Sequence, residues 1–514
     1  MRPVALACIL ALPTGSARAA SLRLVAHSAD GKLLSGSDLL EYIAPHSRKG
    51  KASAQKSGLL LTDIDGNPVD GRPWWVPGSS QPAVAWTNAS RVRLSLPWPV
   101  REDGFSTVFL DKEGAGYSDG DTVDLNADAA LTQYRLFSES MQDRASSWDP
   151  PYKPSPKAAK QQRKLLEALA KAHAAQGPRE RAMLYEKALT ELSLSWGRML
   201  YEHGALMAKH PKIGPSLRWG LTLDESLPSR LGDYDNILKR LGKSGANWVR
   251  LVFRLNPDDF TYSNQRSRLE YDKIISDLES KKIHVMGSVL DSSLWPRGLT
   301  SDALAQRTRN LVLHFKDRVR SWEVASEPNG TCLGGCKTPL SDEAVLRDFT
   351  AAAAEVKKID PSLETVATLY WWEGTAGDDV HATFPWLKRA IPRGAFTQID
   401  MVAMSVYPDD NPMGMAFDTA FRRLAQYFPT KRLMLGAFGY AEGADVDGYW
   451  WLDPSDAGAA RSDLINLYTG AACAIPRAAG GGFWWTTLDQ MFRSSRDADA
   501  LFRVYQRTLW DLGR

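Results

Sequence analysis

The feature that most constrains this chain is a regular alternation of short apolar segments with amphipathic helical segments, from about residue 214 to the C-terminus. Eight of the apolar segments have the length and composition of buried strands, and helical segments such as 271–281 and 343–358 separate them. The predicted strands are 217–223, 247–253, 283–290, 318–325, 365–370, 399–406, 432–438 and 482–487.

Eight strand–helix units in this order are typical of a (β/α)8 barrel. A doubly wound open sheet also alternates, but no glycine-rich phosphate-binding sequence follows the first predicted strand. We therefore expect an α/β fold whose main part, residues 214–514, is a (β/α)8 TIM barrel.

A smaller unit precedes the barrel. Residues 20–140 hold short apolar runs between turn sequences such as DGNP at 65–68, which predicts a small β-sandwich domain. Residues 141–155 are rich in Pro, Ser and Asp and are expected to form a linker, whereas 156–209 return to a helical period. We interpret residues 141–213 as a linker and a helical hairpin that braces the barrel. The predicted sandwich contains four tryptophans that either fill its core or form a sugar-binding face: Trp74, Trp75, Trp86 and Trp98.

Residues 1–19 have the three parts of a secretory signal peptide. Arg2 supplies a positive start, an apolar stretch covers residues 4–13, and Ala17-Arg18-Ala19 is a small-residue cleavage sequence. The mature protein is therefore expected to be secreted or periplasmic. No later apolar run is long enough to predict a membrane-spanning helix.

The charge balance and the tryptophan content narrow the class of ligand. With 63 basic and 60 acidic residues the net charge is only +3, which argues against nucleic acid as a partner. The chain has 18 tryptophans, whose faces suit sugar rings but also fill large cores. We expect a polysaccharide or oligosaccharide partner.

Three cysteines remain after the predicted cleavage. Cys332 and Cys336 are separated by Leu-Gly-Gly, a spacing that could close a small disulfide loop in an oxidising compartment. A zinc pair is the alternative, but no second ligand pair has metal-like spacing. Cys473 falls in a predicted helix and is expected to be a buried thiol. The sequence implies no metal and no organic cofactor.

Candidate site residues gather where the predicted strands end, which is where barrel enzymes carry their active sites. The fourth strand runs into SEPNG at 326–330, and the seventh into GAFGY at 436–440. The second contains NWVRL at 247–251, and the sixth ends in SVYP at 405–408.

These motifs resemble those of the clan of retaining glycoside hydrolases on (β/α)8 barrels that includes families 5 and 39. In that clan the fourth strand ends in Asn-Glu-Pro, with an acid/base Glu, and the seventh in Glu-Phe-Gly, with a nucleophilic Glu. The resemblance gives Glu327 the acid/base position and surrounds the nucleophile with Arg250 and Tyr407. Ser326 replaces the Asn and can still bind a sugar hydroxyl. The resemblance also places Trp484 or Trp485 as an aromatic platform on the eighth strand, and Trp371 and Trp372 follow the fifth strand, where sugar subsites would lie.

The main departure from the clan is Ala437, which occupies the nucleophile position. A retaining reaction needs two carboxyl groups, and a methyl group cannot replace one of them. Another carboxylate could serve, the protein could bind glycans without catalysis, or the alanine could be a substitution of a catalytic glutamate. The alternative carboxylates are Glu442, Asp409, Asp410, Glu373 and Asp489.

Several of these residues also have a purely structural interpretation. Glu323 and Arg250 could be an ion pair inside the barrel, Asp409 and Asp410 fit a turn before Asn-Pro, and Glu442 fits a solvated loop. A general acid at Glu327 would need a raised pKa, which burial and a nearby carboxylate provide. The sequence predicts a secreted glycoside-hydrolase-like protein acting on a β-linked polysaccharide. The alternatives are a non-catalytic glycan-binding protein on the same scaffold, or a cell-surface scaffold with a plugged barrel mouth.

Overall fold

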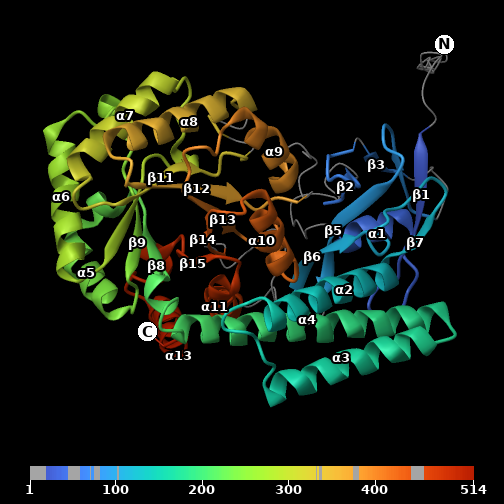
Figure 1. Cartoon of the computed structure of the whole chain (residues 1–514). Helices are drawn as coiled ribbons and strands as arrows, with labels where there is room; N and C mark the ends of the chain where they lie inside the picture. Colours follow the sequence, from blue (N-terminus) through green and yellow to red (C-terminus); the bar gives the residue numbers. More distant parts are fainter. Residues whose placement is uncertain are drawn as a thin grey trace, which may run out of the picture.

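The computed structural model describes residues 19–43, 58–69, 71–74, 81–100, 104–330, 333–334, 339–373, 381–440 and 457–513. Within these residues, a barrel of parallel strands wrapped by helices lies beside two small sheets (Figure 1). Long helices run along one side of both parts and join them (Figure 1).

The barrel is built from eight parallel strands that pair in chain order. Backbone hydrogen bonds close it: Arg218 N donates to Ala479 O (2.8 Å), and Thr222 N donates to Trp484 O (3.0 Å). The predicted (β/α)8 barrel is therefore confirmed. Its strands are β8 (Gly220–Leu223), β9 (Trp248–Val252), β10 (His284–Ser288), β11 (Ser321–Ser326), β12 (Glu364–Tyr370), β13 (Met401–Val406), β14 (Arg432–Phe438) and β15 (Ala478–Gly481).

The last strand is where the sequence-based boundary was wrong. We expected a strand at 482–487, whereas β15 covers Ala478–Gly481. Gly480, Gly481 and Gly482 all have positive φ, and a side chain at Gly481 would overlap the backbone of Leu435. A strand of alanine and glycine carries no hydrophobic signal, so the aromatic run that follows it looked more strand-like.

Helices cover the outside of the barrel, and three of them, α7, α8 and α13, begin at a side-chain cap. The hydroxyl of Thr300 accepts from Ala303 N (3.2 Å), and that of Ser341 accepts from Ala344 N (3.3 Å). The surrounding helices are α5 (Tyr234–Lys243), α6 (Gln265–Ser280), α7 (Ser301–Phe315), α8 (Asp342–Ile359), α9 (Thr383–Ala390), α10 (Ala416–Tyr427), α11 (Ala457–Ala471) and α13 (Arg496–Asp511).

Two small sheets precede the barrel. One has the order β3-β4-β1-β7 and the other β2-β5-β6. Trp86 and Trp98 are 1% and 0% exposed, so they pack the core instead of forming a sugar-binding face. The side chain of Trp74 and the whole of Trp75 lie outside the described residues. The elements are β1 (Ala20–Val25), α1 (Gly36–Ile43), β2 (Leu60–Asp63), β3 (Gly71–Trp74), β4 (Ala83–Trp86), β5 (Val92–Val100), β6 (Gly104–Leu110) and β7 (Thr122–Asp124).

The prediction of strand structure up to residue 140 was wrong, because Leu125–Ser146 forms the helix α2. The carboxylate of Asp124 accepts from Ala127 N (3.2 Å) and caps the helix at its start. Leu125, Ala129 and Phe137 are buried on one side of it. The connection expected at 141–155 is correspondingly shorter, since α2 includes its first six residues.

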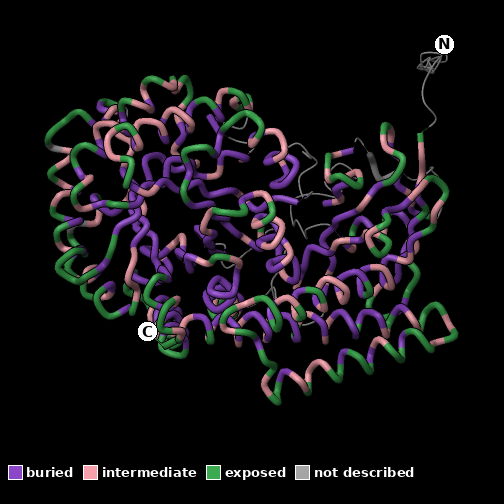
Figure 2. The backbone as a smooth tube through the Cα atoms, in the orientation of Figure 1, coloured by how far each residue is buried: buried purple, intermediate pink, exposed green. Residues whose placement is uncertain are grey.

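Two further helices, α3 (Pro156–Ala174) and α4 (Pro178–Lys209), form the predicted hairpin. Helix α4 packs against α2 and α11 on one side and against α3 on the other, while α3 is exposed along its outer side (Figures 1 and 2). Gly204 permits the contact with α11, because a Cβ there would overlap the carbonyl oxygen of Gly470. Arg144 of α2 also bonds Asp418 of α10 (2.6 Å), and both are 1% exposed. These contacts fix the helices to the barrel.

Some predictions fall outside the described residues. These are the signal peptide, of which residues 1–18 are not described, and the pair Cys332 and Cys336. Cys473 is buried, and its Sγ lies 3.5 Å from Thr469 O, as expected for a core thiol. No helix in the described part of the chain is both long and apolar enough to cross a membrane.

Candidate active site

Glu327 lies immediately after β11, at the end of the barrel where the strands finish. Its N–H donates to Thr368 O on β12 (2.7 Å), and its carbonyl accepts from Gly330 N (2.8 Å). Its φ of +50° is in the left-handed region, which a non-glycine residue occupies only when its surroundings hold it there. Such held backbone conformations are concentrated at functional sites.

Two serine hydroxyls donate hydrogen bonds to the carboxyl group of Glu327. Ser405 Oγ on β13 donates to its Oε1 (2.6 Å), and Ser292 Oγ, after β10, donates to its Oε2 (2.8 Å). Burial raises the pKa of Glu327, and the negative charge of Asp291 raises it further; the two hydroxyls and Arg250 act in the opposite direction. The net result is a pKa of about 7. Below that pH the carboxyl group holds a proton that it can donate.

Arg250 on β9 organises the buried charges next to Glu327. Its Nε and Nη2 donate to Glu323 Oε2 (2.9 and 2.5 Å), and Nη2 also donates to Asp291 Oδ2 (2.8 Å). Burial lowers the pKa of Arg250, but Glu323 and Asp291 raise it by more, so the guanidinium stays charged. Ser326 Oγ donates to the same Asp291 oxygen (3.3 Å). The structural interpretation of Arg250 and Glu323 as an ion pair is therefore correct, and the pair adjoins the candidate acid.

Ala437 lies on β14 directly beside Ser405 in the strand register. Neighbouring residues in this register direct their side chains to the same face of the sheet. Its methyl group therefore lies next to the serine that holds Glu327, and it is 3% exposed. In the described part of the chain, Arg250 Nη1 is buried and has no acceptor.

Two aromatic residues complete this end of the barrel. Burial raises the pKa of Tyr407 well above its usual range, and the negative charge of Glu327 adds to the shift. The ring of Trp485 is partly exposed, with the Arg250 guanidinium carbon 5.0 Å from its centroid. Trp484 is fully buried and donates from Nε1 to Gln490 Oε1 (3.1 Å). Of the two tryptophans, Trp485 is therefore the one at the candidate site.

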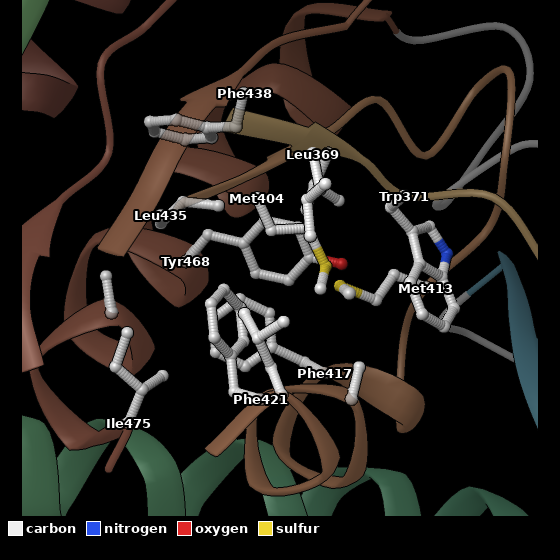
Figure 3. Packing of buried hydrophobic residues seen from close by; sticks show 14 of the residues in the cluster. Leu369, Trp371, Met404, Met413, Phe417, Phe421, Leu435, Phe438, Tyr468 and Ile475 are labelled. Atoms are coloured by element: carbon white, nitrogen blue, oxygen red, sulfur yellow. The ribbon is translucent and has the colours of Figure 1, made fainter. Parts of the chain in front are cut away.

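We expected the two tryptophans after β12 to line the barrel mouth, but both are buried. Trp371 is 1% exposed, and its Nε1 donates to Pro412 O (3.1 Å). Figure 3 shows it beside Met413 in the hydrophobic core. Trp372 is 8% exposed and belongs to a small buried cluster with Leu60 of β2. Trp372 therefore packs against the N-terminal sheet, and the burial of both side chains leaves no open face for a sugar.

The alternative carboxylates are dispersed. Glu373 is directed toward the N-terminal sheet, where Ser95 Oγ donates to it (3.4 Å) and Arg423 lies 3.8 Å away. Asp489 pairs with Arg230 (2.8 Å). Asp410 accepts from the hydroxyl of Tyr370, whose ring lies 6.1 Å from that of Tyr407, so it is linked to the edge of the site. Asp409 is partly exposed beside it. Glu442 is outside the described residues.

Four residues of the site were missed in the sequence. Asp291 and Ser292 follow the third predicted strand, and Glu225 follows the first, so the rule that selected Glu327 could have found all three. Burial raises the pKa of Glu225, with the charges of Asp224 and Asp291 adding to the effect. Ser405 stands in the SVYP sequence at the end of the sixth strand, but its bond to Glu327 depends on the conformation of the turn there.

No family model matches the chain, and no curated protein matches it in sequence. Among solved structures it is similar to a β-glucosidase from Thermotoga maritima in complex with cyclophellitol. The TM-score is 0.42 and the identity 13%, over 58% of this chain and 98% of that one. A family 1 β-glucosidase from the same organism gives a TM-score of 0.38 at 13% identity, over 52% and 88% of the two chains. This similarity is one of barrel architecture.

Proposed function

We propose that this chain is a glycoside-hydrolase-like protein that acts on a β-linked polysaccharide, with Glu327 as its general acid. The observation that carries the proposal is the environment of Glu327 at the C-terminal end of the barrel. A carboxyl group with a pKa of about 7 is still substantially protonated near neutral pH, as a general acid must be.

In this proposal Glu327 protonates the glycosidic oxygen while the bond to the anomeric carbon breaks through an oxocarbenium-like transition state. Ser292 and Ser405 hold the carboxyl group in place for the transfer. Trp485 offers a partly exposed ring for a sugar face.

Hydrolysis also needs a group to activate water or attack the sugar. A carboxylate 6.5–9.5 Å from the acid, roughly, would suit an inverting reaction through water. Asp291 is the described carboxylate whose charge acts most strongly on Glu327, and we take it as the first candidate. Glu442 remains a candidate from the sequence.

The second candidate function is glycan binding without catalysis. Two observations favour it: the methyl group of Ala437 beside Ser405, and the buried Arg250 Nη1 that lacks an acceptor among the described residues. A binding protein could retain the platform and the polar groups of the mouth while lacking the second carboxylate.

The decisive experiment is reducing-sugar release from β-glucans, mannans, xylans and bacterial exopolysaccharides. It compares the chain with Glu327→Gln, with Ala437→Glu, and with the control Glu355→Gln, which removes a carboxylate paired with Arg309 on the outer helices. Hydrolysis that disappears only in Glu327→Gln supports the hydrolase. Hydrolysis that arises only in Ala437→Glu supports the binding protein, whereas activity that survives Glu327→Gln rejects Glu327 as the acid.

We also propose that the protein is exported. The support is the N-terminal sequence, with its positive start, apolar stretch and cleavage sequence. Expression in a bacterial host should give a mature protein that begins at Ala20 and is found outside the cytoplasm. An N-terminus that still carries residues 1–19 would reject this proposal.

A further inference from the structure

A large cavity lies at the end of the barrel opposite Glu327. Its volume is about 690 Å³, within the range of small-molecule sites. Ser216 precedes β8, and Arg432 and Ala478 begin β14 and β15, so these lining residues place the cavity at the N-terminal ends of the strands. The remaining walls come from α10 and from the ends of α2 and α4.

One wall of this cavity is Trp148, just after α2, and its ring is held on several sides. Nε1 donates to Asp143 Oδ2 (3.0 Å), the guanidinium carbon of Arg144 lies 4.4 Å from the ring centroid, and the His203 ring is 5.0 Å away. Arg144 is itself fixed by Asp418 (2.6 Å) and is 1% exposed. A partly exposed tryptophan fixed in this way is a preorganised flat surface, which aromatic recognition of a sugar ring requires.

The charged side chains around Trp148 are mostly basic. The cavity is lined by Lys212, Arg422, Arg432 and Arg477, against two carboxylates, Asp143 and Asp149. Arg477 donates from Nε and Nη2 to three backbone carbonyls, which fixes its charge at the cavity wall. The exposed Lys212 and the partly exposed Arg432 have donors left for a ligand. A positive field beside an aromatic surface favours a ligand that has both a flat apolar face and an acid group.

We propose that this cavity binds an acidic sugar, specifically a uronic acid unit of an oligosaccharide. The pyranose ring would stack on Trp148, and its carboxylate would lie against Lys212 and Arg432. The site shares no residue with the group around Glu327. It can therefore exist whether or not Glu327 is a general acid.

The test is calorimetric titration of the full chain with tetragalacturonate and with cellotetraose as its neutral counterpart. We expect the acidic tetramer to bind and the neutral one to bind at least tenfold more weakly, with affinity for the acidic tetramer falling as salt is added. Lys212→Glu should weaken binding about tenfold or more, since it replaces a charge-assisted contact with repulsion. Trp148→Ala should weaken binding of the acidic tetramer more than Lys212→Glu does.

The matched control is Trp510→Ala, which removes a 77% exposed tryptophan on α13 and should leave binding unchanged. Lys212→Glu changes an exposed residue, so it keeps the test valid if Trp148→Ala does not fold. The proposal is overturned by no binding of tetragalacturonate, by equal binding of both tetramers, or by binding that survives Lys212→Glu.

Discussion

Because the pKa of Glu327 is raised, the stability of the protein should depend on pH in a way that can be measured without a substrate. When the folded protein holds a proton that the unfolded chain has already lost, folding becomes less favourable as pH rises. For Glu327 this interval lies between its ordinary pKa of 4.5 and its folded pKa of about 7. The variant Glu327→Gln cannot ionise and therefore escapes this loss. We expect the unfolding free energy of Glu327→Gln to increase relative to that of the parent chain as pH rises through that interval.

The magnitude follows from the size of the pKa change. Each pKa unit corresponds to about 1.36 kcal/mol, so the rise from 4.5 to about 7 is worth about 3 kcal/mol. The difference in unfolding free energy between Glu327→Gln and the parent should grow by up to about 1.4 kcal/mol per pH unit between pH 4.5 and 7. Outside that interval Glu327 has the same protonation in the folded and unfolded parent, so the difference between the two proteins should be constant.

Denaturant unfolding of both proteins at pH 5, 6, 7 and 8 measures this difference directly. Glu355→Gln is the control. Hydrogen bonding to Arg309 lowers the pKa of Glu355 from its ordinary value of 4.5, so this carboxyl group titrates below pH 5. Its stability difference from the parent should not change between pH 5 and 8. A Glu327→Gln difference that is equally flat would refute the assignment of a raised pKa.

Three further predictions concern single contacts. Ser292→Ala removes a hydroxyl that lowers the pKa of Glu327, so the pKa, followed by the same stability titration, should rise by about one unit. Gly204→Ala places a methyl group against the carbonyl of Gly470 and should cost about 1–3 kcal/mol in denaturant unfolding, whereas no loss would reject the close packing of α4 on α11. Arg144→Met leaves the buried Asp418 without its cation and should cost about 3–5 kcal/mol, part of which the double variant with Asp418→Leu should recover.

The barrel could be predicted because its strands are buried on both faces. Every residue of β13 is buried, and all of them except Ser405 are apolar, so the sequence displays this strand directly. The strand β15 did not display this signal, because its four residues are alanine and glycine and the chain there needs positive φ. Helix α2 was missed because polar residues such as Asn126, Thr132 and Gln133 are buried along it and blur its apolar stripe.

The candidate site was predicted in part for a similar reason. Glu327, Tyr407 and Ala437 occupy strand ends, which the order of strands in a barrel brings together, and Arg250 lies within the neighbouring strand β9. The tryptophans were harder to assign, since the same residue type fills cores and binds sugars. Trp371 and Trp485 both follow barrel strands, but only the burial of the first distinguishes their roles.

The central claim is that Glu327 donates the proton in glycosidic cleavage. The most direct measurement is the pH dependence of kcat/KM on the glycan that is hydrolysed fastest, for the chain and for Ser405→Ala. Because an acid must be protonated to act, kcat/KM should fall on the alkaline side with a pKa near 7. Loss of the Ser405 hydroxyl should move that fall to higher pH. A rate with no alkaline fall, or a fall that Ser405→Ala leaves in place, would contradict the claim.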